Sequence, residues 1–287
     1  MGQWDFAGDE LIFFLTATVT AVFGAYFWYG ALVRRTPLQR PAWIRTALGV
    51  APVVALSGLG IVLTRWADPL YVVGNLDYQL LFLSGGTAWL WVVAAVSPLL
   101  GISVTDDAIE RSNPAAACVA CGSILGVMAI YAWSNVGSGP TIATTLLPAL
   151  ACTVTWLLLW FAVELMSRPS EAIAVDRDLP SGIRHAGMLI AMGLILGRAV
   201  AGDWTSWHST FTDMLLLGWP VVFLPMGSAA IHLFLRPSTV RPQPSIAGAG
   251  VVPAVLFLVM SVGYVESLGV PDIGRHVVTY EEYIQSR

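Results

Sequence analysis

The residues best suited to chemistry in this sequence are three carboxylates in one short polar segment. Asp106, Asp107 and Glu110 lie within S-V-T-D-D-A-I-E-R-S-N at 103–113, and Arg111 is the base beside them. Carboxylates are costly to leave next to anionic headgroups, so the cluster suits a basic partner, a polyamine or a cation. The alternative is a solvated helix start, where acids are stabilised by the N-terminal dipole. We expect a binding surface here rather than a catalytic one.

A second candidate is a pair of opposite charges at the ends of two neighbouring apolar segments. Arg198 lies within a turn of the end of one segment, and Asp213 lies in the first turn of the next. We expect an interfacial ion pair, with Asp203 as an alternative partner of the arginine. A substrate or ion site is the other interpretation, because ionisable residues in membrane segments are often functional. No ionisable residue falls near the middle of an expected span, where proton pumps and sodium-coupled transporters keep their sites.

Two histidines raise the question of haem or metal. His185 and His232 are expected at similar depth near the ends of neighbouring antiparallel helices, where solvated or headgroup-facing rings are the simpler interpretation. The sequence contains no nucleophile elbow, zinc-protease motif, phosphate-binding loop or dinucleotide fingerprint. It therefore predicts no catalytic residue, no metal site and no cofactor, and it indicates a protein that is not an enzyme.

The composition shows what kind of element must carry these residues. Of the 287 residues, 56% are hydrophobic and 11% are charged, and the mean hydropathy is +0.73. An average soluble protein has roughly 25% charged residues. The composition excludes a disordered chain, argues against a soluble globular domain and makes a lipid bilayer the expected surrounding. A net charge of −4 without a basic patch excludes the usual kind of nucleic-acid binder.

Eight apolar stretches are long enough to cross a bilayer as helices, which takes about 20 mostly apolar residues. Each is bounded by charges, Pro or Gly, and Ser181 is the expected N-cap of the sixth. We predict an all-α polytopic transmembrane bundle of eight spans in four hairpins, forming one integral membrane domain, 1–287. The expected spans are 10–33, 46–66, 79–102, 114–136, 142–166, 183–202, 210–235 and 247–268. They group into an N-terminal hairpin (10–66), a four-span repeat unit (79–202), a C-terminal hairpin (210–268) and a tail (269–287).

The distribution of arginine predicts the orientation. All 14 basic residues are Arg, and ten of them lie in or beside the loops at 34–45, 103–113, 167–182 and 236–246. Positive residues collect on the cytoplasmic side of a membrane. We therefore expect a multi-pass protein of the bacterial inner (plasma) membrane with both termini and the tail in the periplasm. The remaining four arginines, expected on the periplasmic side, are Arg65, Arg198, Arg275 and Arg287.

The spacing of glycine indicates where helices approach each other closely. Gly122 and Gly126 are four residues apart in the fourth expected span, and Gly193 and Gly197 have the same spacing in the sixth. In lipid, helices associate through close contacts along small residues rather than through hydrophobic force. We expect these glycines to face neighbouring helices. Because a loop with acidic residues precedes both spans on the same side, we also expect two repeated hairpins related by a pseudo-twofold axis along the membrane normal.

The segment from Thr105 to Ala117, T-D-D-A-I-E-R-S-N-P-A-A-A, resembles the loop-and-helix signature of the YjfL-type bacterial inner-membrane proteins (domain of unknown function 350). In that family an acidic loop precedes I-x-x-G-N-x-A-A-A, and a further Gly follows along the helix, where Gly126 stands in this chain. The second copy of the family pattern is degenerate, and G-L-I-L-G at 193–197 is similar to it.

This chain also departs from the family pattern. Ser112 replaces the family Gly, Pro114 stands at a position that is usually apolar, and Gly182 replaces the Asn of the second copy. The resemblance covers about 80–202 and implies a four-span unit, here flanked by an extra hairpin on each side. The family has no settled activity, so the resemblance implies a fold rather than a reaction.

Three functions remain open from the sequence. The first is a non-enzymatic membrane scaffold or assembly subunit, which acts on other membrane proteins or on a second copy through its loops and helix faces. The second is a channel or transporter for a small ion or solute, which a polar cavity reaching the middle of the membrane would favour. The third is a haem-binding or redox subunit, which bound haem would favour.

Overall fold

The computed structural model describes residues 8–34, 42–235, 245–269, 271 and 273. Within them, eight segments are long and apolar enough to cross a membrane, which confirms the predicted all-α transmembrane bundle. The long helices are α1 (Gly8–Arg34), α2 (Ala42–Arg65), α3 (Leu76–Val96), α4 (Pro114–Trp133), α5 (Ala143–Ser167), α6 (Leu179–Ala199), α7 (Trp207–Gly218), α8 (Phe223–Leu235) and α9 (Val252–Ser267). The short ones are η1 (Ser97–Leu100), η2 (Val104–Glu110), η3 (Glu171–Val175), η4 (Trp219–Val222) and η5 (Ile246–Val251).

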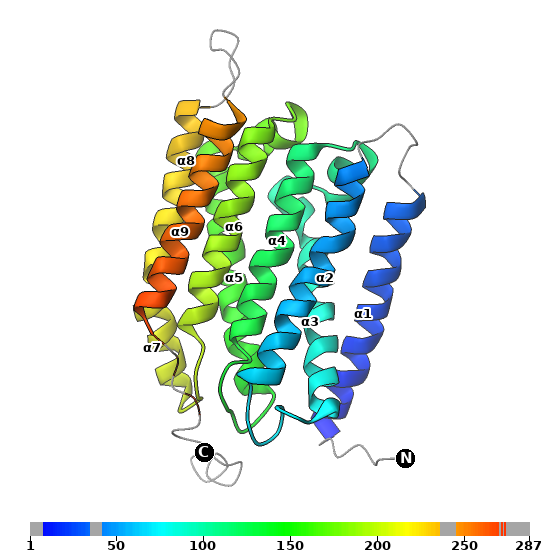
Figure 1. Cartoon of the computed structure of the whole chain (residues 1–287), viewed down its shortest axis with the longest axis vertical. Coiled ribbons are helices and arrows are strands. Elements are labelled where there is room, and N and C mark those ends of the chain that lie inside the picture. The colour runs from blue at the N-terminus through cyan, green and yellow to red at the C-terminus, as the bar shows by residue number, and fades with distance from the viewer. Residues whose placement is uncertain (1–7, 35–41, 236–244, 270, 272, 274–287) are drawn as a thin grey trace.

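The helices form two rows (Figure 1). In one row α2, α4, α6 and α9 pack side by side in that order, and behind them α1 packs on α3 while α5 packs on α8. The interface between α4 and α6 is the most extensive in the described bundle, so this pair forms its centre. In the most apolar 18-residue stretch of α1, 11% is buried, against 78% in the corresponding stretch of α4. Helix α1 therefore lies at the rim.

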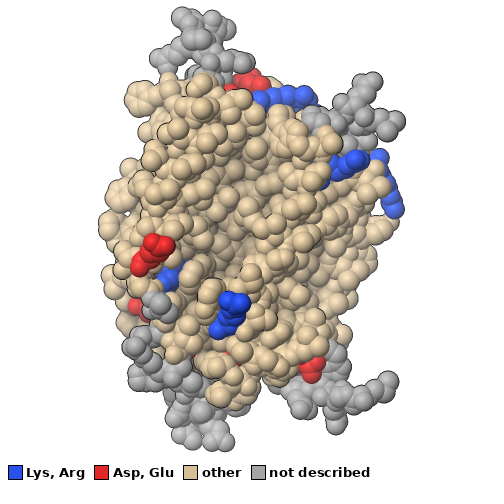
Figure 2. Space-filling view, viewed as in Figure 1, with Lys and Arg blue, Asp and Glu red and all other residues tan. Residues whose placement is uncertain are grey.

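The two ends of the bundle differ in charge. Helix α1 ends and α4 and α6 begin at one end, beside Arg34, Arg111, Arg168 and Arg177, and we call it the Arg-rich end; α1 begins and α9 ends at the other, which we call the terminal end (Figure 1). From the level at which α9 ends up to the Arg-rich end, the face shown in Figure 2 is almost free of charge. The side of the membrane that each end faces stays a prediction. The predicted tail, 269–287, lies almost entirely outside the described residues.

Proline alters two of the predicted spans. The seventh, predicted as one helix, is divided, because η4 and its Pro220 separate α7 from α8. In the third, α3 gives way to η1 at Ser97, next to Pro98. Proline has no N–H to donate and its ring clashes with the preceding turn, so a regular α-helix does not pass through it unchanged. Both segments remain long enough to span a membrane.

The sixth span begins earlier than predicted. Its N-cap is Asp178, whose carboxylate accepts a hydrogen bond from the backbone N–H of Ser181 at 3.1 Å. Ser181, the predicted N-cap, therefore lies inside the first turn of α6. Pro180 fits beside it because the first N–H groups of a helix have no helical acceptor. Because α6 starts earlier than predicted, Arg184 lies inside the bundle, where it is 2% exposed.

Candidate functional site

The predicted acidic segment is a short π-helix, wider than an α-helix, at the Arg-rich end. Helix η2 runs from Val104 to Glu110 with π-type hydrogen bonds. The hydroxyl of Ser103, its N-cap, accepts a hydrogen bond from the backbone N–H of Asp106 at 3.1 Å. The chain then turns at Ser112, whose φ of 50° lies in the left-handed region. Glycine adopts that conformation without steric cost, which explains why the resembled family pattern has Gly at this position.

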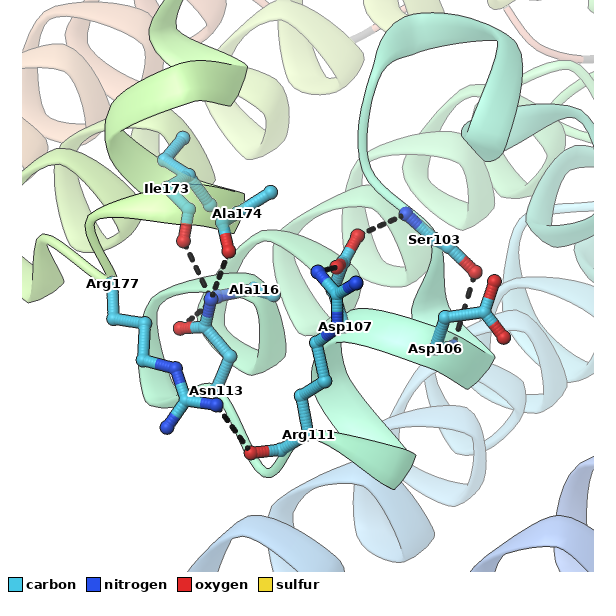
Figure 3. Close-up of polar contacts among 9 residues, drawn as sticks. All are labelled: Ser103, Asp106, Asp107, Arg111, Asn113, Ala116, Ile173, Ala174 and Arg177. Carbon is cyan, nitrogen blue, oxygen red and sulfur yellow. Dashed lines mark hydrogen bonds and ion pairs between the residues drawn. The ribbon is translucent and has the colours of Figure 1, made fainter.

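Asn113 joins this segment to the loop before α6 (Figure 3). Its side-chain oxygen accepts hydrogen bonds from the backbone N–H groups of Ala115 and Ala116 at 2.9 and 3.3 Å, which caps α4. Its amide nitrogen donates to the carbonyl oxygens of Ile173 and Ala174 at 2.6 and 3.4 Å. Asn113 is 0% exposed, and these bonds satisfy polar atoms that are costly to bury without partners.

A second hydrogen bond connects the same two segments. The guanidinium of Arg177 donates to the backbone carbonyl oxygen of Arg111 at 3.1 Å. Arg177 has a left-handed φ of 57° and directly precedes the N-cap of α6, as Ser112 directly precedes the N-cap of α4. The two loops are therefore held together as one surface, which we call the joint loop surface (103–113 and 171–178). The pseudo-twofold rotation of the two hairpins stays a prediction.

The three predicted carboxylates do not share one surface. Asp107 is 7% exposed, and its carboxylate accepts hydrogen bonds from the backbone N–H of Ser103 at 2.9 Å and from the guanidinium of Arg111 at 3.1 Å. Asp106 is exposed and Glu110 is partly exposed. Asp107 is thus committed to the fold, because it closes the turn of η2, and the predicted binding surface reduces to Asp106 and Glu110.

The four predicted glycines lie where α4 and α6 cross. Gly126 packs directly on Gly193. A Cβ added at Gly122 would lie 2.6 Å from the backbone of α6, and one added at Gly197 would lie 2.8 Å from a carbonyl oxygen of α4. Gly193 lies farther from the N-cap of α6 than Gly122 lies from the N-cap of α4, and the difference is more than one helical turn. The two pairs meet, but they are not equivalent positions of the predicted repeat.

Arg198 and Asp213 do not pair. Arg198 is buried, and its guanidinium donates to the carbonyl oxygens of Leu268 and Gly269 at 3.3 and 2.9 Å, where α9 ends. Asp213 is exposed on α7, and its carboxylate accepts a hydrogen bond from the hydroxyl of Ser209 at 3.4 Å. The predicted ion pair is wrong because the end of a helix offers unpaired carbonyl oxygens and a negative dipole, which attract the same cation.

A buried basic cluster lies near the Arg-rich end between α6, α8 and η5. The sequence placed His185 and His232 at similar depth, but the expectation of solvated or headgroup-facing rings is wrong, since they are 1% and 3% exposed. The burial of Arg184 beside them was not predicted.

The guanidinium of Arg184 donates to the carbonyl oxygen of Ala249, to the hydroxyl of Ser181 at 3.1 Å and to Nδ1 of His232 at 3.1 Å. All three acceptors lack negative charge, because an acceptor nitrogen of histidine belongs to a neutral ring. Burying a cation without a carboxylate in contact is costly. A functional role is the usual reason for an ionisable residue within a membrane span.

His185 lies next to Arg184 in α6 and is 1% exposed. Its ring packs on that of Trp160, with the ring centroids 5.6 Å apart. Neither ring nitrogen of His185, nor the indole N–H of Trp160, has a hydrogen-bond partner within the described ranges. Buried polar atoms without partners are uncommon in folded proteins. Had Asp178 been recognised as the N-cap of α6, Arg184 and His185 would have been expected inside the span.

The fold and these contacts define a multi-pass helical membrane protein built around the α4–α6 pair. Residues 70–200, which contain α3 to α6, match the model of the family described as Domain of Unknown Function (DUF350). The match confirms the family resemblance that the sequence showed over about 80–202. No curated protein and no solved structure matches the chain.

Proposed function

We propose that the chain is a non-enzymatic scaffold of the bacterial inner membrane, a subunit that holds partner proteins at its Arg-rich end. The observation that carries the proposal is the joint loop surface, which the side chains of Asn113 and Arg177 hold together. A surface whose backbone is already fixed loses little conformational entropy when a partner binds. The arginine distribution supports a cytoplasmic position for this surface and a periplasmic position for both termini.

The joint loop surface presents the kinds of side chain that protein docking uses. Asp106 and Arg177 are exposed, and the Arg111 side chain is 60% exposed. Val175, two residues before Arg177, is 74% exposed. An apolar contact surrounded by polar and charged groups is the usual anatomy of a protein interface.

The helix pair below this surface supports the same role. Helices α4 and α6 meet backbone to backbone at Gly126 and Gly193, so main-chain atoms fill the line along which the two helices cross. Close contacts of this kind hold membrane helices together without help from polar groups. A fixed loop surface on a tightly packed helix pair suits a subunit that positions other proteins.

Cross-linking in cells, purification of the tagged full-length chain in mild detergent and quantitative mass spectrometry test the proposal. The double variant Asp106→Arg with Val175→Glu should lower the recovery of co-purifying proteins at least ~10-fold, the effect of losing ~1.4 kcal/mol at an interface. Glu266→Arg, an exposed change at the terminal end, should leave the recovered set unchanged. Equal recovery with both variants, each inserted in normal amount, would overturn the proposal.

A channel or transporter for a small ion or solute is the second candidate, and the buried basic cluster favours it. Arg184 hydrogen-bonds only to acceptors without negative charge in the described part of the chain, so a permeating species that it attracts is an anion. Chloride flux into proteoliposomes that contain the purified chain tests this candidate, with Arg184→Gln as the variant expected to lose flux. Flux no faster than into protein-free vesicles removes it.

The haem or redox alternative would need both His185 and His232 as ligands, and His232 does not fit that role. A histidine binds a metal through the lone pair of a ring nitrogen, whereas Nδ1 of His232 already accepts a hydrogen bond from Arg184. We therefore do not propose it.

A further inference from the structure

The end of α8 is hydrogen-bonded to α6 through one ring nitrogen of a histidine. Nδ1 of His232 accepts a hydrogen bond from the guanidinium of Arg184 at 3.1 Å, and the hydroxyl oxygen of Ser181 lies 3.4 Å from the same nitrogen. Ser181 and Arg184 are each 2% exposed and His232 is 3% exposed, so water does not compete for these contacts. The polar attachment of α8 to α6 therefore depends on the protonation of Nδ1.

The hydrogen bonds show that this ring is neutral. Arginine has N–H donors and no acceptor, so Nδ1 of His232 must be the acceptor and carries no proton. The hydroxyl of Ser181 accepts from Arg184 at 3.1 Å, which leaves its own proton to be donated toward Nδ1. His232 is therefore an imidazole with its one ring proton on Nε2.

A proton added to Nδ1 would reverse the contact. An imidazolium has two N–H donors and no acceptor, so His232 would face the donor groups of Arg184 and Ser181 instead of accepting from them. A second positive charge would also stand 3.1 Å from a guanidinium nitrogen, where the absence of water makes the repulsion strong. Acid therefore favours separation of His232 from α6.

The acid that acts on Arg184 balances one positive charge and not two. Asp178, the N-cap of α6, interacts electrostatically with Arg184. Its carboxylate accepts a hydrogen bond from the backbone N–H of Ser181 at 3.1 Å. The other titratable neighbour on α6 is His185, which interacts with both Arg184 and His232 and is a base.

The remaining elements around the cluster offer no counter-charge that is uncommitted. On α5, Glu164 lies one turn beyond Trp160, and its carboxylate accepts from the hydroxyl and the backbone N–H of Ser170. Residues 245–263, which include η5 and most of α9, contain no titratable side chain. A proton on His232 thus has no acid to pair with among these described elements.

The last turn of α8 is free to move without α7. Helix η4 and Pro220 separate the two helices, and proline interrupts the ladder of backbone hydrogen bonds that would stiffen a continuous helix. Leu233 and Phe234, on the outer side of α8, are 52% and 73% exposed. In a bilayer these side chains face lipid in either position, so a small outward movement brings no new apolar surface into water.

We propose that His232 and Arg184 form a pH-sensitive latch, which holds the last turn of α8 against α6 and opens when His232 takes up a proton from the Arg-rich side. The latch needs no partner protein and does not rest on the scaffold proposal. An imidazole in water titrates near pH 6.5. Because only the open state binds the extra proton, acid favours opening, and the opening equilibrium should rise about 10-fold between pH 7.5 and 5.5.

Hydrogen exchange of the purified full-length chain in detergent, followed by mass spectrometry, tests the proposal. Protection factors of the 228–235 backbone, each referred to the intrinsic rate at the same pH, should fall about 10-fold from pH 7.5 to 5.5. His232→Asn keeps an acceptor near the position of Nδ1 but does not titrate, so it should abolish this fall. His232→Leu removes the acceptor, so its protection should be low at both pH values.

Two other histidines serve as matched controls. His208→Gln changes an exposed histidine on α7 and should keep the full pH response. His185→Gln should also keep it, because the His185 ring packs on Trp160 of α5 and has no hydrogen bond to α8 within the described chain. Three results would each overturn the proposal: pH-independent protection in the unaltered chain, an unchanged response in His232→Asn, or loss of the response in either control.

Discussion

Glycine occupies two kinds of position in this bundle, with opposite consequences. At the centre, Gly126 and Gly193 bring α4 and α6 into backbone contact. At the rim, Gly58 of α2 and Gly263 of α9 have no atom within 4 Å of an added Cβ. Both surroundings are apolar in a membrane, so hydrophobicity does not distinguish them. The distance to the backbone of the neighbouring helix distinguishes them. It makes glycine indispensable at one position and replaceable at the other.

The largest contrast should come from leucine at these two positions. Gly126→Leu forces α4 away from α6 and should lower the free energy of unfolding by about 1–3 kcal/mol or abolish insertion. Gly58→Leu should change it by less than about 0.5 kcal/mol. Thermal unfolding in detergent, followed by tryptophan fluorescence, measures both. Equal losses would show that the centre and the rim do not differ as described.

Two asparagine N-caps extend the contrast to polar residues. Asn113→Ala removes the cap of α4 and the buried bond to Ile173, and should cost about 2 kcal/mol of unfolding free energy. Asn75 caps α3 through one bond, to the exposed Asp77 N–H at 3.1 Å, so Asn75→Ala should cost about 1 kcal/mol or less. The same melting experiment compares them, and a greater loss at position 75 would contradict the structural role of Asn113.

Two adjacent aspartates give a smaller contrast. Asp107→Asn weakens the bonds to the Ser103 N–H and to Arg111 and should cost about 1 kcal/mol, since Arg111 is largely solvated. Asp106→Asn should leave stability within about 0.5 kcal/mol. Hydrogen exchange of the 103–111 backbone, measured by mass spectrometry, should rise only for Asp107→Asn. A rise for Asp106→Asn alone would reverse their roles.

The smallest expected effect concerns two arginines near the terminal end. Arg198→Gln removes a charge that bonds to the carbonyl oxygens at the end of α9 and should cost about 0.5 kcal/mol. The loss should appear as faster hydrogen exchange over the last turn of α9. Arg65→Gln, an exposed position on α2, should leave that exchange unchanged. If α9 is unaffected by Arg198→Gln, the carbonyl contacts do not hold its end.

The sequence predicted what depends on apolar length and local spacing. The eight spans follow from the extent of the apolar stretches, and the close approach of four glycines to neighbouring helices follows from their spacing on two spans, whereas the pairing of Gly126 with Gly193 does not. The buried environment of Arg184 did not follow, because placing the helix start at Ser181 instead of Asp178 leaves that arginine among the headgroups. The internal bonds of Asp107 and the bond from Arg184 to His232 depend on which segments meet, and local spacing does not determine that.

The long-range bond of Asn113 has a consequence for biosynthesis. Its partner Ile173 is 60 positions later in the chain. At roughly 5–20 residues per second, the ribosome delivers Ile173 about 3–12 s after Asn113. The partner of Gly126 on α6 arrives later still, so α4 resides in the bilayer for seconds with its closest packing face bare. The yield of folded protein thus depends on what shelters α4 during that interval, and not only on the stability of the finished bundle.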